Sequence, residues 1–247
     1  MLTRLSYALL SFCMILITGC TASKQLSNNK NENGFRQIFD GRTLKDWEGD
    51  VTYWRVEDGA IVGEITPQTI LKRNTFIIWR GGSPADFELK LSYRISALGN
   101  SGVNYRSVEI DTLKYALKGY QADIDGKNKY NLGYPRGSGQ NYEERGRQFL
   151  ALRGQRVVIE PGAKPKLLDS LGSHETLLKS IHYDDWNELH IIAKGSNLKH
   201  YINGTLMSEV IDNDTMNRTM SGLIGVQVHV GQPMKIEYRN IRLKVLK

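Results

Sequence analysis

Polar side chains that can transfer protons lie on one face of a predicted strand. The segment Gly-Tyr-Gln-Ala-Asp-Ile-Asp ends at Asp125, and alternation along a strand places Gln121, Asp123 and Asp125 on the same face. Two carboxylates at positions i and i+2 stand roughly 7 Å apart, twice the rise of ~3.3 Å per residue. That spacing suits an acid and a base that act on neighbouring atoms, or a divalent cation. The alternative is an ordinary strand that runs into an Asp-Gly turn.

Two further segments carry polar side chains on one face and apolar side chains on the other. These polar residues are Asn104 and Arg106 in the segment 102–106, and Gln227 and His229 in the segment 226–230. A solvated strand face is usually richer in Lys and Glu, as in the segment 86–95. The shared asymmetry therefore indicates a ligand face. The alternative for His229 is a hydrogen-bonded structural histidine.

A second polar group, Tyr-Glu-Glu-Arg-Gly-Arg at 142–147, follows the glycine-rich stretch 131–139. Tyr142, Glu144 and Arg145 combine an aromatic ring with charged and planar polar groups. Sugar pockets need such groups, because hydroxyls require hydrogen-bond partners and the sugar ring packs on an aromatic face. A surface ion-pair cluster is the alternative.

The elements expected to position these residues are short strands. Residues 54–63 predict a hairpin with Asp58-Gly59 at its turn, residues 86–95 alternate along one strand, and residues 188–194 and 198–207 predict a second hairpin with a turn at 195–197. Strands over 222–230 and 234–245 close the chain. This regular spacing predicts an all-β sandwich or jelly roll of two antiparallel sheets, with a short helix within 167–180 and one domain over 34–247.

Composition excludes several classes of protein. The chain has 247 residues with 40% hydrophobic and 24% charged residues, which is typical of a globular protein. The formal charge of +7 is dispersed rather than clustered, so we expect no nucleic-acid partner. No phosphate-binding loop, dinucleotide fingerprint, zinc motif or G-x-S-x-G sequence follows residue 20.

The N-terminus predicts export and lipid attachment. A short apolar stretch over 9–17 fits a secretory signal, and the small pair Thr18-Gly19 before Cys20 resembles a bacterial lipobox. We therefore expect a signal peptide over 1–19, a lipidated Cys20, and a polar tether over 20–33. Thr21 is compatible with the outer membrane, on its periplasmic or surface side, and the lipid is the only membrane contact expected. In the alternative, Cys20 is incidental. Neither cysteine remains for chemistry in the domain.

Ten short motifs occur in the order typical of one known family. They are IFDGRTLKDW at 38–47, WRVEDG at 54–59, DFEL at 86–89, GNSGVNYR at 99–106, GYQADI at 119–124, YEERGR at 142–147, WNE at 186–188, ING at 202–204, VQVHVG at 226–231 and RNIRL at 239–243. Together they resemble the 3-keto-disaccharide hydrolase domain family over roughly residues 35–246. The resemblance implies a concanavalin A-like jelly-roll sandwich.

The resemblance also implies cleavage of glycosides whose sugar is already oxidised to a ketone at C3. The ketone makes the C2 proton removable, so the C1 substituent leaves by β-elimination and water then adds. The implied acid and base are Asp123, Glu144 and His229, without assignment among them. The implied ligands of the enolate oxygen and hydroxyls are Asn104, Arg106 and Gln121, with Glu64, Asp125, Tyr142 and Arg145 as further pocket residues. A divalent metal on the acidic strand is a possible cofactor.

Two other functions are compatible with the same residues. The segment Asp-Ile-Asp is similar to the alternating carboxylates of β-glucanase folds, but no third carboxylate follows at the next position on that face. This departure disfavours a direct retaining glycosidase. A non-catalytic glycan-binding lipoprotein needs the polar face without groups that titrate, and it is the principal alternative.

Overall fold

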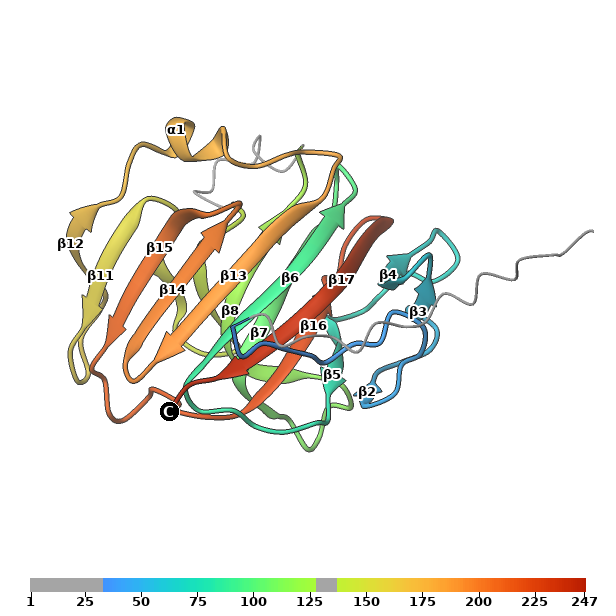
Figure 1. Ribbon diagram of the computed structural model, residues 1–247, viewed down its shortest axis with the longest axis horizontal. Coiled ribbons are helices and arrows are strands. Elements are labelled where there is room, and N and C mark those ends of the chain that lie inside the picture. Colours follow the sequence, from blue (N-terminus) through green and yellow to red (C-terminus); the bar gives the residue numbers. More distant parts are fainter. Residues whose placement is uncertain (1–32, 128–136) are drawn as a thin grey trace, which may run out of the picture. The chain divides into compact units, whose positions relative to one another are not determined.

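The computed structural model describes residues 33–127 and 137–247, which form two packed β-sheets (Figure 1). The predicted signal segment 1–19, Cys20 and residues 20–32 of the predicted tether lie outside the described residues. So do residues 128–136, which include most of the glycine-rich stretch. No helix among the described residues has the length and apolar character needed to span a membrane.

The first sheet of the described chain has ten strands in the order β12-β11-β15-β14-β13-β6-β17-β4-β3, with β1 paired to β17. Their bounds are β1 Arg36–Gln37, β3 Trp54–Glu57, β4 Ala60–Ile65, β6 Phe87–Ile95, β11 Gln155–Ile159, β12 Lys166–Ser170, β13 Asn187–Lys194, β14 Asn197–Ile202, β15 Thr205–Asp212 and β17 Met234–Val245. Neighbouring strands pair antiparallel, except that β11 and β15 pair parallel. The sequence predicted antiparallel pairing only.

The second sheet of the described chain has seven strands in the order β10-β9-β8-β7-β16-β5-β2. Their bounds are β2 Trp47–Glu48, β5 Thr75–Trp79, β7 Asn100–Glu109, β8 Leu117–Asp125, β9 Asn141–Glu144, β10 Gln148–Ala151 and β16 Leu223–Val228. One short helix, α1 (His174–Leu178), is the only helix in the described ranges, and it lies within the predicted segment 167–180. The predicted all-β sandwich is confirmed.

Alternation and turn chemistry explain the strands. Along β6 buried and half-buried residues alternate without interruption, as the sequence predicts. Asp58 and Gly59 adopt φ values of 49° and 78°, the left-handed conformation of a tight hairpin turn. Asn203 and Gly204 do the same, with φ values of 49° and 78°. The predicted strand 198–207 is therefore wrong, because this Asn-Gly pair divides it between β14 and β15.

The core between the sheets is rich in aromatic residues. Trp54, Tyr93, Tyr105 and Tyr238 are nearly or completely buried, and each buried ring contributes roughly 1.5–3 kcal/mol through the removal of apolar surface from water. The hydroxyl of Tyr105 lies 2.8 Å from Nε2 of His200, so the interior contains satisfied polar groups as well. Burial lowers the pKa of His200 to about 4, which keeps this core imidazole neutral.

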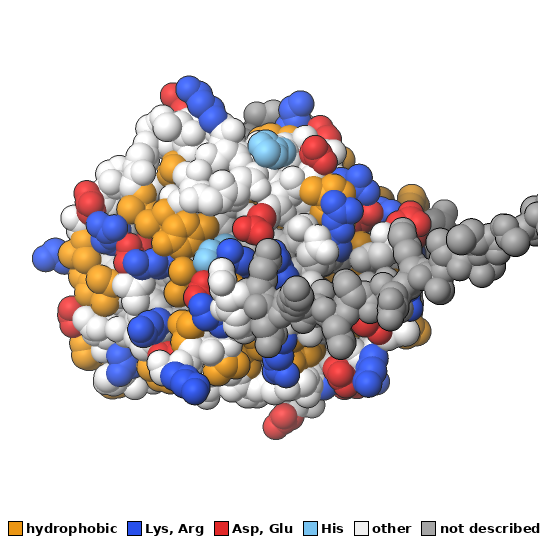
Figure 2. Space-filling model, in the orientation of Figure 1, with side chains coloured by type: hydrophobic (Ala, Val, Ile, Leu, Met, Phe, Trp, Pro, Cys, Tyr) orange, Lys and Arg blue, Asp and Glu red, His pale blue; other side chains and the backbone are white. Residues whose placement is uncertain are grey.

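The outer side of the first sheet carries paired charges. Figure 2 shows basic and acidic side chains interspersed over this face. Glu237 accepts bonds of 2.7 and 3.0 Å from Arg94, and Lys244 lies 3.2 Å from Glu88. Ion pairs at a protein surface typically contribute about 0–1 kcal/mol of stability. The face resembles an ordinary solvated surface, unlike the outer face of the second sheet.

A bulge in β7 changes the direction of Arg106. Its φ is 45°, and the register with β8 shifts between Tyr105 and Val108. The predicted alternation that placed Arg106 beside Asn104 is therefore broken. Arg106 is 1% exposed and donates to the carbonyls of Ala85 and Gly195 at 2.9 and 2.8 Å and to Asp86 at 2.9 Å.

We predict that Arg106→Met lowers the free energy of unfolding by about 2–4 kcal/mol, because it removes a buried cation from three acceptors and leaves them unpaired. Arg55→Met is the matched control, since Arg55 is 43% exposed in its ion pairs and we expect a change of about 0–1 kcal/mol. Urea unfolding monitored by tryptophan fluorescence measures both. Equal effects of the two substitutions would contradict a structural role for Arg106.

Candidate functional site

A polar cavity of about 390 Å³ lies over the outer face of the second sheet. Seven of the residues predicted as site residues line it: Gln121, Asp123, Asp125, Tyr142, Glu144, Arg145 and His229. The rest of the lining was not predicted and consists of Asn74, Asn100, Gln140, Gln148 and Phe149. We call this space the sheet cavity.

Strand parity explains why these side chains converge. In β8 the residues between the site positions, Ala122 and Ile124, are completely buried in the core. Gln121, Asp123 and Asp125 must therefore face outward. In β9, Tyr142 and Glu144 face outward for the same reason, since Glu143 on the inner side binds Arg147 at 2.6 Å.

Asp123 is held by two amide side chains. Nε2 of Gln121 donates to Oδ1 at 2.7 Å, and Nε2 of Gln140 donates to Oδ2 at 2.6 Å. Burial, followed by the charge of Asp125, raises the pKa of Asp123 to about 7 even though both amide bonds favour the carboxylate. The side chain keeps partial contact with solvent at the cavity. Asp123 can thus gain and lose a proton near neutral pH.

Glu144 is another carboxyl residue of the cavity, which Asp123 and Asp125 also line, and it is 7% exposed. Its Oε1 accepts from Asn74 at 3.2 Å and its Oε2 accepts from Gln227 at 3.4 Å. Nε of Arg145 lies 3.8 Å from Oε1. Burial raises the pKa of Glu144, and the amides and Arg145 oppose this rise only in part.

Gln227 connects Glu144 to Asp123 through Gln121. Its Nε2 lies 3.2 Å from Oε1 of Gln121 and 3.4 Å from Oε2 of Glu144. Since Gln121 also donates to Asp123, a chain of hydrogen bonds joins Asp123 to Glu144. Gln227 is completely buried, and its backbone carbonyl accepts a bond from the hydroxyl of Ser101 in the core.

Glycine at position 102 makes room for this chain. A Cβ at Gly102 would lie 2.5 Å from Cδ of Gln121, closer than two such atoms approach in proteins. The side chain of Gln121 therefore packs directly on Gly102, and any larger residue at position 102 would displace it. Gly102 lies near the beginning of β7, which starts at Asn100.

The segment before β5 completes the site. Oδ1 of Asn74 accepts the backbone N–H of Val230 at 2.9 Å, while Nδ2 of Asn74 donates to Glu144. Asn74 thereby fixes the chain beside His229, whose Nδ1 lies 2.6 Å from the carbonyl oxygen of Val230. Three strands separate β9 from β5 in the sheet, so this contact requires the outer face to curve inward.

An aromatic wall closes one side of the sheet cavity. The rings of Tyr142 and Phe149 pack edge to face with centroids 5.1 Å apart. Arg145 lies in the turn between β9 and β10, and Gln148 begins β10; their φ values are 55° and 68°. Both residues lie at the exposed rim.

Three residues predicted as ligands lie elsewhere. Glu64 belongs to β4 in the first sheet and pairs with Arg55 at 2.7 Å. Arg106 is directed away by the bulge in β7. Asn104 is on the outer face opposite Gln121 in the register but is completely buried beneath neighbouring residues, and it is not part of the cavity lining.

Sequence signals differ among the residues that were not predicted. Gln227 shares a face with His229 in a predicted strand, so a pattern pointed to it. Gln140 directly follows the glycine-rich stretch, and Asn74 precedes the apolar run of β5. Their roles depend on contacts between distant segments, which the sequence does not display.

No group of three or more His, Cys, Asp or Glu side chains suited to a metal ion occurs in the described parts of the chain. Asp123 and Asp125 alone do not form such a set. The divalent metal that the sequence allowed therefore has no such set of ligands among the described residues.

Residues 34–244 match the family model described as the 3-keto-alpha-glucoside-1,2-lyase-like domain. The chain belongs to this family. The match spans nearly all the described residues and includes every lining residue of the sheet cavity. A search of the curated proteins with this chain found no match.

Solved structures support the fold of the lyase-like domain. A candidate glycosyl hydrolase from Parabacteroides distasonis is 18% identical, with a TM-score of 0.57 over 90% of this chain and 98% of its own. A Bacillus subtilis protein with a galectin-like fold is 14% identical, with a TM-score of 0.54 over 82% and 90%. Carbohydrate binding module CBM66 from Bacillus subtilis is 17% identical, with a TM-score of 0.50 over 81% and 95%. The sandwich is thus galectin-like and concanavalin A-like.

We predict that Asp123→Asn stabilises the lyase-like domain at pH 8 but much less at pH 5. The carboxyl group takes up a proton near pH 7 when folded and near 4 when unfolded, so wild-type stability falls as pH rises between these values. The stability difference between variant and wild type should grow by about 2–3 kcal/mol from pH 5 to pH 8. Denaturant unfolding at both values measures it, with exposed Asp169→Asn as control. A difference independent of pH would refute the raised pKa.

Proposed function

We propose that the sheet cavity binds a 3-keto-glycoside and that Asp123 removes the proton at C2. The observation that carries this proposal is the carboxyl group of Asp123, whose pKa of about 7 suits a base at neutral pH. Membership of the family of 3-keto-alpha-glucoside-1,2-lyase-like domains supports the same substrate class.

The reaction proceeds by elimination followed by hydration. Asp123 takes the C2 proton, and the electron pair of the C–H bond forms an enolate with the C3 ketone. Collapse of the enolate forms the C1=C2 double bond and breaks the bond from C1 to the glycosidic oxygen. Water then adds across this double bond, with hydroxide at C1 and a proton at C2, and the net result is hydrolysis.

Glu144 serves as the acid in this proposal. Burial raises its pKa, so it holds a proton to higher pH than an exposed glutamate does and can donate it to the leaving oxygen. Arg145, 3.8 Å from Glu144, supplies positive charge near the developing anion. Gln121, Gln140 and Gln227 position the two carboxyl groups, and the ring of Tyr142 offers a surface for the sugar.

The first test compares a 4-nitrophenyl 3-keto-glucoside with its unoxidised counterpart, in both anomers and with and without EDTA. We expect release of nitrophenol from the oxidised sugar only, because the unoxidised sugar has no acidic C2 proton. Loss of activity with EDTA would show that a cation contributes. Saturable binding of oligosaccharides without cleavage would instead support the alternative, a glycan-binding module. The similar fold of the carbohydrate binding module CBM66 is compatible with that alternative.

Asp123→Asn should reduce kcat on the 3-keto-glucoside by about 10²- to 10⁴-fold, the usual contribution of a general base. In the wild type, kcat/KM should fall about tenfold per pH unit below pH 7, because the base is then protonated. Asp169→Asn, at an exposed position on β12, should match the wild type. A wild-type profile without this acid limb would exclude Asp123 as the base.

Glu144→Gln tests the acid through the leaving group. We expect kcat to fall about 10²-fold or more for a methyl 3-keto-glucoside, whose leaving oxygen needs a proton. The nitrophenyl substrate should lose much less, since nitrophenolate departs without one. Glu188→Gln on β13, which is 41% exposed, is the control. Equal losses on both substrates would show that Glu144 does not act as the acid.

Lipid attachment at Cys20, and with it an outer-membrane location, is also proposed here on the sequence alone. Mass spectrometry of the protein isolated from its membrane fraction tests it. A diacylglyceryl modification at Cys20 is expected, and Cys20→Ser should release the protein from the membrane. An unmodified chain that keeps residues 1–19 would contradict the proposal.

A further inference from the structure

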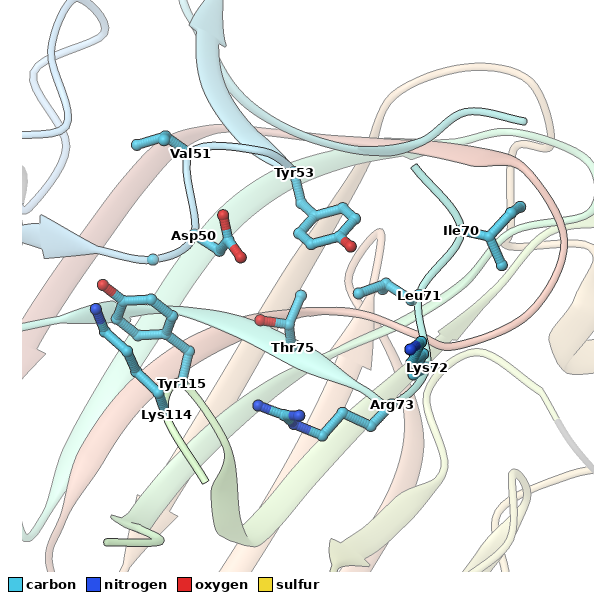
Figure 3. Close-up of a pocket in the computed structure, with 11 residues that line it drawn as sticks. Asp50, Val51, Tyr53, Ile70, Leu71, Lys72, Arg73, Thr75, Lys114 and Tyr115 are labelled. Carbon is cyan, nitrogen blue, oxygen red and sulfur yellow. The ribbon is translucent and has the colours of Figure 1, made fainter. Parts of the chain in front are cut away.

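A second cavity, of about 580 Å³, lies at the edge of the second sheet beyond β5. Figure 3 shows its lining side chains arranged around an open centre. They come from the turn after β2, the segment that leads into the first residue of β5, and the loop before β8. We call this space the edge cavity.

The two cavities share a wall. Arg73 and Thr75 line the edge cavity, while Asn74 between them lines the sheet cavity and binds Glu144. Side chains alternate along extended chain, so neighbouring residues here serve different cavities. The backbone N–H of Phe76 donates to the carbonyl of Tyr115 at 3.0 Å, which fixes Tyr115 along the edge of β5. The edge cavity therefore begins one residue from Asn74, which binds the carboxyl group of Glu144.

The lining of the edge cavity is cationic. Lys72, Arg73 and Lys114 stand against a single acidic residue, Asp50. Lys72 and Arg73 are exposed, and neither forms an ion pair with any described residue. Arg94, by contrast, is paired with Glu237 on the other sheet. Unpaired cations around a hollow favour an anionic ligand.

Aromatic and apolar groups give the same cavity a place for a ring. Tyr53 and Tyr115 are half-buried and face the cavity from two sides (Figure 3). Lys114 lies 4.8 Å from the centroid of the Tyr115 ring, so charge and ring stand together. Ile70, which is 52% exposed, adds apolar surface at the rim. A ring that bears a negative charge matches this combination.

We propose that the edge cavity binds the leaving group of the substrate and that this group is a ring carrying a carboxylate. The inference rests on the proposed function, because it assigns the sugar to the sheet cavity and the group beyond the glycosidic oxygen to the edge cavity. A uronic acid and an aromatic acid share this chemistry. The preferred substrate is thus an acidic 3-keto-glycoside.

Binding of the isolated leaving group tests the edge cavity without catalysis. Calorimetry compares 4-hydroxybenzoate with 4-hydroxybenzamide, and glucuronate with glucose. We expect at least one acid to bind about tenfold more tightly than its neutral counterpart, with the preference declining as salt increases. The pair that shows the preference identifies the source of the ring. Equal binding of acid and neutral forms in both pairs overturns the proposal.

Kinetics place the site relative to the reaction. We expect a 4-carboxyphenyl 3-keto-glucoside to have a KM about tenfold below that of the 4-carbamoylphenyl compound. The double variant Lys72→Gln/Arg73→Gln should abolish this difference by raising KM for the acid alone. The control variant Lys166→Gln/Lys179→Gln removes the same charge at exposed positions on β12 and after α1. It should leave KM unchanged for both the acid and the carbamoyl compound.

Failure of the two proposals can be told apart. Cleavage of both compounds with equal KM overturns the edge cavity as a leaving-group site and leaves the proposed reaction intact. Absence of cleavage, together with acid binding that Lys72→Gln/Arg73→Gln removes, overturns the proposed reaction and the leaving-group role but keeps the anion site. Acid binding that survives the double variant places the anion elsewhere and overturns the edge cavity.

Discussion

The hydrogen-bond chain from Asp123 through Gln121 and Gln227 to Glu144 is the constraint on which the rest of the site depends. Two carboxyl groups that are largely removed from water repel each other when both are charged, and neutral amides hold them without supplying a counter-charge. Had arginines taken the place of these amides, both pKa values would fall and both groups would stay ionised. The choice of glutamine over a cation is therefore what allows two carboxyl groups to differ in protonation state.

The sandwich provides the rigidity that this chain requires. Each outward-facing residue on β8 and β9 alternates with a buried inner residue, so the position of a site side chain is fixed by the packing of its neighbours. Ser101 extends this coupling, because it joins the backbone of Gln227 to the hydroxyl of Tyr238 in the opposite sheet. The cost of placing polar groups on a curved, enclosed face is thus offset by the apolar core beneath it.

Much of this arrangement could be predicted from strand parity alone. Alternation placed Asp123, Asp125 and Gln121 on one face, and the polar residues after the glycine-rich stretch proved to line the same cavity. Parity failed at Arg106, where one residue in the left-handed region reverses the direction of the side chain. Strand parity also did not predict the role of Asn74, since that residue acts through a contact with Glu144, 70 positions away in the chain. Local periodicity predicts which residues share a face of a strand. Bulges and contacts between distant segments depend on the whole fold, so periodicity does not predict them.

The shared wall between the two cavities has a consequence for how this protein can change. Arg73, Asn74 and Thr75 alternate between the two cavities. A single inserted or deleted residue before β5 would therefore turn each of these side chains toward the other cavity. An amide would then enter the cationic space, and a cation would lie against Glu144. Substitutions in this segment alter one compartment at a time, but a change of length disturbs both together. Diversity of leaving groups among related chains should therefore arise from residue replacement at fixed spacing in this segment.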